Sequence, residues 1–236
     1  MKWIEPSIRL LTPIDGEDVL RRVEYACRTC YQSYDRIGEG SAEKLIRGCI
    51  KRGHESVLEH VQLSFEVVCS RACLAQWTRH RLSSYSVMSQ RYCDYTKDKF
   101  GGEITCIRPE WWKNVPQKDG EPIDLLDDTD NNGREWLGRW YLFNEGVKFV
   151  ESRYKFLINR GMKAEDARGL LPNCAATTMV WSANLREIRH FIQVRTTPGA
   201  QAEIKRLAYD LIAIMESNGL GLLVEDLVER EESSQT

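Results

Sequence analysis

The stretch VQLSFEVVCSRACLAQWTRHRLSSYSVMSQR, residues 61–91, decides how this chain is organised. From Val61 to Cys69 apolar and polar side chains alternate, which is the period of a strand with one buried face. Ser70 is a good N-cap, and the apolar residues after it recur at helical spacing until about His80. A loop is expected to follow. A half-buried antiparallel strand joined directly to a helix favours a mixed α+β fold.

The second half of the stretch has a composition that a packed core would not favour. Arg79, His80 and Arg81 are adjacent, and a Ser-x-Arg follows at Ser89 and Arg91. Adjacent like charges repel unless an anion joins them. If the chain is locally extended, the last two residues share one face and pair a hydroxyl with a guanidinium fork, which suits a phosphate. The alternative is a solvated basic face, although tyrosine and methionine interleave with the charges.

Periodicity predicts further elements on both sides of this stretch. Residues 7–15 indicate an edge strand and a turn. Helices are expected at 17–31, 71–80, 135–159, 165–171 and 200–216. Another is expected from Ser41, as its N-cap, to a stop at Gly53, and one more begins at Ser182 or Asn184. Asn184 and Glu187 have the spacing of a capping box. The acidic, turn-rich residues 113–133 indicate an exposed insertion, and residues 229–236 a frayed tail.

The absence of repeats and of a strong linker favours a single domain over residues 1–236. We expect an α+β fold with a largely antiparallel sheet flanked by helices. Of the 236 residues, 42% are hydrophobic and 29% charged, which is typical of a globular protein. The net charge of −2 argues against a general nucleic-acid binder. No stretch reaches membrane-spanning length, so no membrane partner and a cytoplasmic location are expected.

Cysteine and histidine spacing argues against a metal site. The eight cysteines are scattered, which favours a reduced protein with free thiols. Cys27 and Cys30 form a lone C-x-x-C, for which two buried thiols are favoured over zinc or redox chemistry. His54 and His60 are six residues apart, a spacing that does not place two imidazoles on one helix face. We therefore expect no metal.

A second group of arginines lies in the C-terminal half, at Arg168, Arg186, Arg189 and Arg195. Arg189 is interpreted as ordinary helix-surface charge. Arg195 ends an apolar helical segment and precedes a Thr-Thr-Pro-Gly turn, a position that suits a pocket as well as compensation of the helix dipole. The chain has no Walker loop and no G-x-G-x-x-G, so a flavin or nucleotide would be held by side-chain donors and helix ends.

Arg79-His80-Arg81, followed by seven residues and Ser89, resembles the signature of the flavin-dependent thymidylate synthases (ThyX). The resemblance runs in order from about residue 7 to residue 215. It also includes three further segments: Gly53-His54-Glu55-Ser56-x-x-Glu59-His60, Arg168 with Leu171-Pro172, and Trp181-x-x-Asn184-x-Arg186-x-x-x-His190-x-x-x-x-Arg195.

The resemblance implies methylation of dUMP to dTMP, with methylene-tetrahydrofolate giving the carbon and NADPH giving the hydride through FAD. It also implies a homotetramer whose sites are shared between subunits. Carried over by position, the dUMP-binding residues are Gln76, Arg79, Ser89, Gln90, Arg91, Arg168 and Arg195. The implied FAD-binding residues are His54, Ser56, Glu59, Arg79, His80, Arg81, Asn184, Arg186 and His190.

We assign the catalytic role to Arg195, because a cation beside the N3–O4 edge of the pyrimidine would stabilise the anionic ring in the transition state. Two departures from the family stand out: Ser86-Val87 where many relatives have Asn-Glu, and Cys30 in place of a small hydroxyl residue. Two rival hypotheses remain. One is a non-enzymatic nucleotide- or RNA-binding module that uses the Arg-His-Arg patch, and the other is a synthase with Cys93 as nucleophile.

Overall fold

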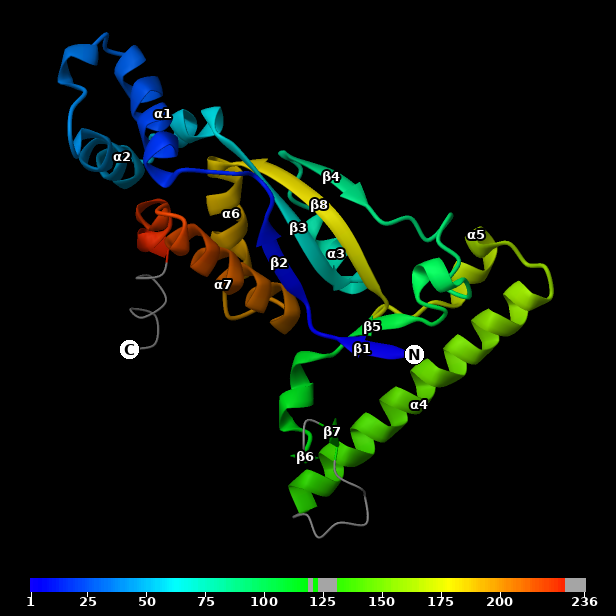
Figure 1. Cartoon of the computed structure of the whole chain (residues 1–236). Coiled ribbons are helices and arrows are strands. Elements are labelled where there is room, and N and C mark those ends of the chain that lie inside the picture. The colour runs from blue at the N-terminus through cyan, green and yellow to red at the C-terminus, as the bar shows by residue number, and fades with distance from the viewer. Residues whose placement is uncertain (119–120, 123–130, 228–236) are drawn as a thin grey trace. The chain divides into compact units, whose positions relative to one another are not determined.

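The computed structural model describes residues 1–118, 121–122 and 131–227. These residues form two compact units (Figure 1). The first unit comprises residues 1–6, 69–74 and 88–177, and the second comprises residues 7–68, 75–87 and from 178 onward. Whether both belong to one catalytic domain stays a prediction. The expected tail at 229–236 lies outside the described residues.

The second unit is built on a four-stranded sheet in the order β2 (Ser7–Leu10), β3 (Gln62–Ser70), β8 (Ala176–Asn184) and β4 (Ser83–Val87). β2 pairs antiparallel with β3, and β4 pairs antiparallel with β8. The predicted strand at 61–69 and the edge strand after residue 7 are therefore confirmed. The expected loop after His80 is wrong, because residues 83–87 form β4 in the sheet.

Helices pack against this sheet and against one another. They are α1 (Gly16–Thr29), α2 (Ser41–Lys51), residues 75–77 of α3 (Arg71–Trp77), α6 (Leu185–Arg195) and α7 (Ala202–Ser217), with a 3₁₀ segment at Glu55–His60. α1 packs on α2, and α7 packs on β2 and α6. Figure 1 shows α1 and α2 side by side beyond one end of the sheet.

An aromatic cluster fills the core between β3, β8, α3 and α6. Trp77, Trp181, Phe65 and Phe191 are all fully buried. The ring centroids of Trp77 and Phe191 are 4.3 Å apart, and those of Trp77 and Trp181 are 5.3 Å apart in an edge-on arrangement. Such pairs add about 0.5–1.5 kcal/mol each beyond the burial of their area. This cluster fixes the C-terminal end of α3, where the arginine-rich motif begins.

Capping residues set where the helices begin. The Asn184 side chain accepts a hydrogen bond from the Glu187 amide at 2.9 Å, which is half of the predicted capping box. The prediction that Ser41 caps α2 is wrong. Gly40 is the N-cap, with φ +67°, and Ser41 is the first helical residue, whose hydroxyl donates to buried Glu24 at 2.7 Å. Glycine suits this cap because it adopts positive φ without steric cost.

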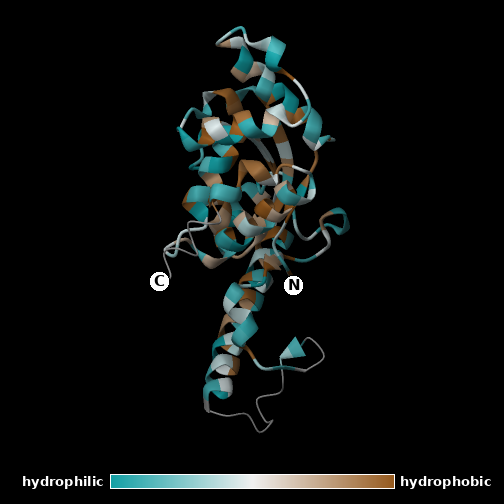
Figure 2. Ribbon diagram, turned by 90° about the vertical axis from the view of Figure 1, so that its left-hand side faces the viewer, coloured by the Kyte–Doolittle hydropathy of each residue, from teal (hydrophilic) through white to brown (hydrophobic). Residues whose placement is uncertain are grey.

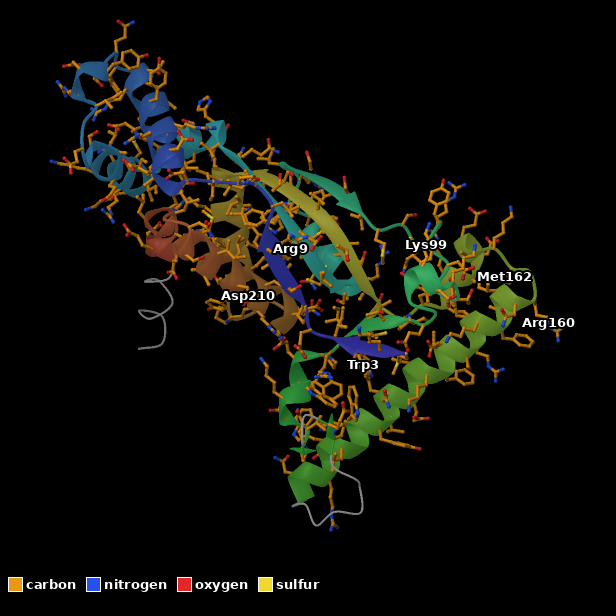
Figure 3. The ribbon with its side chains drawn as sticks, viewed as in Figure 1. Trp3, Arg9, Lys99, Arg160, Met162 and Asp210 are labelled. Carbon is orange, nitrogen blue, oxygen red and sulfur yellow. The ribbon has the colours of Figure 1, made fainter. Side chains whose placement is uncertain are left out.

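The first unit combines a parallel strand pair with a long helix. β1 (Lys2–Ile4) pairs with β5 (Thr105–Ile107), and α4 spans Asn131–Asn159. Trp3 lies on β1 (Figure 3), and its indole donates to Asn144 of α4 at 3.0 Å. The remaining elements are α5 (Ala164–Ala167), β6 (Gln117–Lys118), β7 (Glu121–Pro122) and 3₁₀ segments at Asp98–Phe100, Glu110–Asn114 and Arg168–Leu170.

Both hydrophilic and hydrophobic residues occur along the length of α4 (Figure 2). Its buried side joins two clusters, one of which contains Trp112, Val115, Leu137 and Trp140. Val115 is only 2% exposed, so the prediction that all of 113–133 is an exposed insertion is wrong at its start. Residues 119–120 and 123–130 lie outside the described part of the chain.

The eight cysteines are free thiols, as expected from their scatter. Cys27 is buried, with its Sγ 3.8 Å from the Sγ of Cys49, and burial raises the pKa of the Cys27 thiol to about 12. Cys30 follows the last residue of α1 and is exposed, so the expectation of two buried thiols is wrong for this residue. Among the described residues, no helix is long and apolar enough to cross a membrane.

Candidate functional site

A cavity of about 570 Å³ lies within the second unit. The arginine-rich motif lines it with Arg79, His80 and Arg81, and the start of α6 lines it with Asn184, Arg186 and His190. Glu59, from the 3₁₀ segment before β3, completes the set of expected flavin residues in this wall. Segments about 100 positions apart in the sequence therefore meet around one hollow of cofactor-site size.

The sheet and two helix ends hold these side chains in place. The Tyr85 hydroxyl on β4 lies 2.6 Å from the carbonyl oxygen of His80 and 3.0 Å from that of Trp77, so it tethers the turn after α3. On α6, Arg186 and His190 are four residues apart and share a face. The N-terminus of α6 also borders the cavity, and its partial positive charge favours anions there.

His80 is the buried centre of a polar array. Arg195 Nε donates to His80 Nε2 at 3.0 Å, and an Nη of Arg195 donates to the carbonyl oxygen of Gln76 at 2.8 Å. On the other side of the ring, His80 Nδ1 lies 3.3 Å from a carboxylate oxygen of Glu187.

His80 and Glu187 are each 5% exposed. Because Nε2 accepts from a guanidinium, this geometry requires a neutral imidazole with its proton on Nδ1.

Electrostatics reinforce that protonation state. Burial, followed by the positive charge of Arg195 and by His190, lowers the pKa of His80 from 6.5 to about 4. Burial also raises the pKa of Glu187, and His190 opposes that rise. The imidazole is therefore neutral at physiological pH and acts as a fixed acceptor for Arg195.

Ion pairs hold the other charged side chains of the cavity wall in place. Glu59 pairs with Arg186. Arg189 is 4% exposed and binds Glu55 at 3.1 Å and Asp226 at 2.7 Å. The interpretation of Arg189 as surface charge is therefore wrong. Its side chain lies on the buried face of α6, and two carboxylates compensate the charge of its guanidinium.

Two expected flavin residues lie elsewhere in the second unit. His54 and Ser56 line a separate cavity of about 320 Å³, together with Cys30 and Arg52. The C-x-x-C segment and the segment after α2 thus meet in a second hollow. Within one chain, the nine expected flavin residues are divided between two cavities.

Four expected dUMP residues belong to the first unit. Arg91 Nε pairs with Glu165 at 2.8 Å, and Arg168 Nε donates to the backbone carbonyl of Glu165 at 3.0 Å. The expectation of an extended Ser89–Arg91 segment is wrong, because the chain turns here and the Ser89 hydroxyl accepts from the Arg91 amide at 3.2 Å. Gln90, between them, is half-buried.

The remaining dUMP residues, Gln76, Arg79 and Arg195, belong to the second unit. The Gln76 side chain donates to Gln201 at 2.6 Å, Arg79 is exposed on the cavity wall, and Arg195 joins the His80 array. Sequence reasoning missed Glu187, which it treated only as a helix-capping residue. A carboxylate three positions before His190 on an amphipathic helix was the available signal.

The arrangement is that of an α+β protein with a polar, arginine-rich cavity and no glycine-rich phosphate loop. Among residues 1–118, 121–122 and 131–227, no group of three or more His, Cys, Asp or Glu side chains could hold a metal ion. The chemistry available in the described part of the chain is anion binding and charge stabilisation by guanidinium and imidazole groups.

Residues 12–218 match the Thy1 family, described as thymidylate synthase complementing protein. The chain belongs to this family. It is 36% identical over 185 residues to the flavin-dependent thymidylate synthase of Pyrococcus furiosus, covering 78% of this chain and 66% of that protein. It is 32% identical over 214 residues to the flavin-dependent thymidylate synthase of Mycolicibacterium vanbaalenii, and the match covers 88% of this chain and 78% of that protein. The resemblance drawn from the motifs is thus confirmed.

Solved structures show the same fold. ThyX from Helicobacter pylori with FAD and dUMP superposes with a TM-score of 0.64 at 24% identity, covering 94% of this chain and 98% of that one. A second structure is that of the UMP/dUMP methylase PolB from Streptomyces cacaoi, bound with 5-Br dUMP. It superposes with a TM-score of 0.74 at 20% identity, and the match covers 96% of this chain and 97% of that one. The expected α+β, ThyX-like fold class is confirmed.

Proposed function

We propose that this protein is a flavin-dependent thymidylate synthase that converts dUMP to dTMP. Methylene-tetrahydrofolate gives the carbon, and NADPH gives the reducing equivalents through FAD. The observation that carries the proposal is the convergence of Arg79-His80-Arg81 and Asn184-x-Arg186-x-x-x-His190 on one cavity, in a chain of the Thy1 family. Helicobacter pylori ThyX, which has the same fold, was crystallised with FAD and dUMP.

The residues of the cavity fit the anionic parts of FAD. Arg79, Arg81 and Arg186 are charge-assisted donors of the kind that diphosphates require, and the α6 N-terminus adds favourable backbone dipoles. The arginines that flank His80 would favour the reduced, negatively charged ring system. When bound, FAD supplies hydride transfer that no protein side chain can perform.

A homotetramer with shared sites accounts for the division of the flavin residues. His54 and Ser56 line a different cavity from His80 within one chain. We propose that the smaller cavity of one subunit contributes these two residues to a site whose larger cavity comes from another.

For dUMP, we assign the phosphate to Arg91, Arg168, Ser89 and Gln90, and the pyrimidine to Gln76, Arg79 and Arg195. Arg91 and Arg168 already converge on Glu165. A phosphate would replace the Glu165 carboxylate as the partner of Arg91, since both are oxyanions that accept from a guanidinium.

Arg195 is the residue that would act on the reaction itself. His80 Nε2 and the Gln76 carbonyl hold its guanidinium from two directions. A guanidinium oriented in this way would stabilise the negative charge that develops on the pyrimidine as carbon 5 attacks the transferred carbon. We place the enzyme in the cytoplasm. The non-enzymatic nucleotide- or RNA-binding alternative is not favoured, because the matched relatives are named as synthases.

Purified protein tests the proposal directly. We expect a yellow preparation, or one that becomes yellow on reconstitution with FAD, that oxidises NADPH at a rate changed by added dUMP. A protein that cannot be loaded with flavin and that binds single-stranded RNA instead would overturn the proposal in favour of the binding module.

A further inference from the structure

The long helix α4 exposes a row of large apolar side chains. Leu142, Phe149 and Phe156 are 73%, 58% and 50% exposed, whereas Val147 and Tyr154, on the opposite side, are 5% and 0% exposed. A spacing of seven residues keeps the row on one face of the helix over about 21 Å. Single exposed apolar residues are ordinary, but a continuous row indicates a binding surface.

Two glycines lie on the same face, one turn before and one turn after Leu142. A β-carbon built at Gly138 or Gly146 would meet no heavy atom within 4 Å. Glycine inside a helix costs about 1 kcal/mol relative to alanine. The described part of the chain offers no steric reason for either glycine, whereas the close approach of another helix would offer one.

The charges on this face complement one another across a twofold axis. Glu145 lies four residues before Phe149, and Arg153 lies four residues after it. If two copies of α4 pack antiparallel with their Phe149 residues opposed, Glu145 of each copy faces Arg153 of the other. Leu142 of each then faces Phe156. A parallel arrangement would oppose Glu145 to itself, so the pattern selects the antiparallel one.

We propose that this face of α4 is an interface between two copies of the chain, related by a twofold axis at Phe149. Within one chain these charges have only weak partners: Glu145 pairs with Lys148 at 2.8 Å, and the Arg153 guanidinium lies 4.8 Å from the Phe149 ring. The inference rests on the homo-oligomer proposed above and identifies one of its surfaces. It uses no residue of the candidate site.

Sedimentation velocity over a range of protein concentrations tests the interface with a charge exchange. We expect Glu145→Arg alone and Arg153→Glu alone each to raise the dissociation constant of the contact at least about tenfold, since each creates two like-charge pairs. The double variant Glu145→Arg/Arg153→Glu restores both pairs and should return the constant to near the wild-type value. Lys44→Glu, a charge reversal at an exposed residue of α2, is the matched control and should change nothing.

Cross-linking gives an independent measure if a charge variant folds poorly. Phe149→Cys, lying on the axis, should give a covalent dimer under mild oxidation, because two β-carbons brought that close can form a disulfide. Lys148→Cys and the wild type should not. If both single charge reversals leave the dissociation constant unchanged, this interface is wrong. It is also wrong if the double variant dissociates as readily as the single variants. Either result leaves the proposed oligomer itself standing. A monomeric wild type overturns the proposed oligomer as well.

Discussion

At the scale of single residues, His80 is the centre of the candidate site. Its ring lies between the Glu187 carboxylate on the cavity side and the Arg195 guanidinium. A neutral imidazole is the acceptor that Arg195 needs, and burial keeps it neutral. The sequence identified His80 and Arg195 as functional residues, but their contact depends on the fold, because 115 positions separate them.

The lowered pKa of His80 predicts a loss of stability in mild acid. The unfolded chain binds this proton near pH 6.5 and the folded chain only near pH 4, so stability falls as the pH decreases between these values. The loss would amount to roughly 2–3 kcal/mol. The raised pKa of Glu187 opposes the effect in part.

Urea unfolding at pH 7.0 and pH 4.5 measures this loss. His80→Gln, which cannot titrate, should show a smaller fall in unfolding free energy than the wild type. Equal falls in the two proteins would mean that His80 is not the group responsible.

Replacing Arg195 by lysine should lower turnover at saturating dUMP by roughly 10²–10³-fold, the usual effect of losing one donor to a developing charge. Lysine keeps the positive charge but cannot bond His80 and the Gln76 carbonyl in the same planar geometry. Steady-state kinetics with varied dUMP separates the effects. A rise in KM with unchanged kcat would show that Arg195 only binds substrate.

Cys93→Ala should leave turnover nearly intact. Cys93 is a half-buried free thiol, and we assign the stabilisation of the pyrimidine to Arg195 instead. The same steady-state assay decides this point. Loss of dTMP formation in a folded, flavin-loaded Cys93→Ala protein would establish the rival mechanism with a cysteine nucleophile.

At the scale of elements, the apolar periodicity of the sequence predicted the helices well but missed a strand at the edge of the sheet. The 3.6-residue pattern predicted α1, α4, α6 and α7 to within a few residues. β4 was missed because three of the five residues of SSYSV are serines and none is fully buried, so its strand character comes from pairing with β8. The pocket wall formed by His80 and α6 follows from that pairing, through the Tyr85 tether.

The N-cap of α6 has a measurable effect on stability. Asn184→Ala removes the side-chain acceptor of the Glu187 amide and should lower the free energy of unfolding by about 1 kcal/mol. Asn184→Asp keeps an acceptor at the same place and should retain most of that stability. Thermal or urea unfolding of the two variants compares them, and equal destabilisation would show that the cap contributes nothing.

At the scale of the whole molecule, sequence motifs predicted the family and its chemistry better than the architecture. Family membership followed from residues 79–91 and 181–195, because charged groups required by a substrate keep a fixed spacing. The two compact units and the division of the flavin residues between two cavities did not follow, since both depend on contacts distant in sequence.

The formation of dTMP tests the central claim most directly. Flavin-loaded protein is incubated with dUMP, NADPH and methylene-tetrahydrofolate labelled in its transferable carbon, and the nucleotides are separated. We predict labelled dTMP that disappears when any one of the three substrates is omitted. Flavin-loaded protein that oxidises NADPH yet gives no labelled dTMP under these conditions would contradict the account.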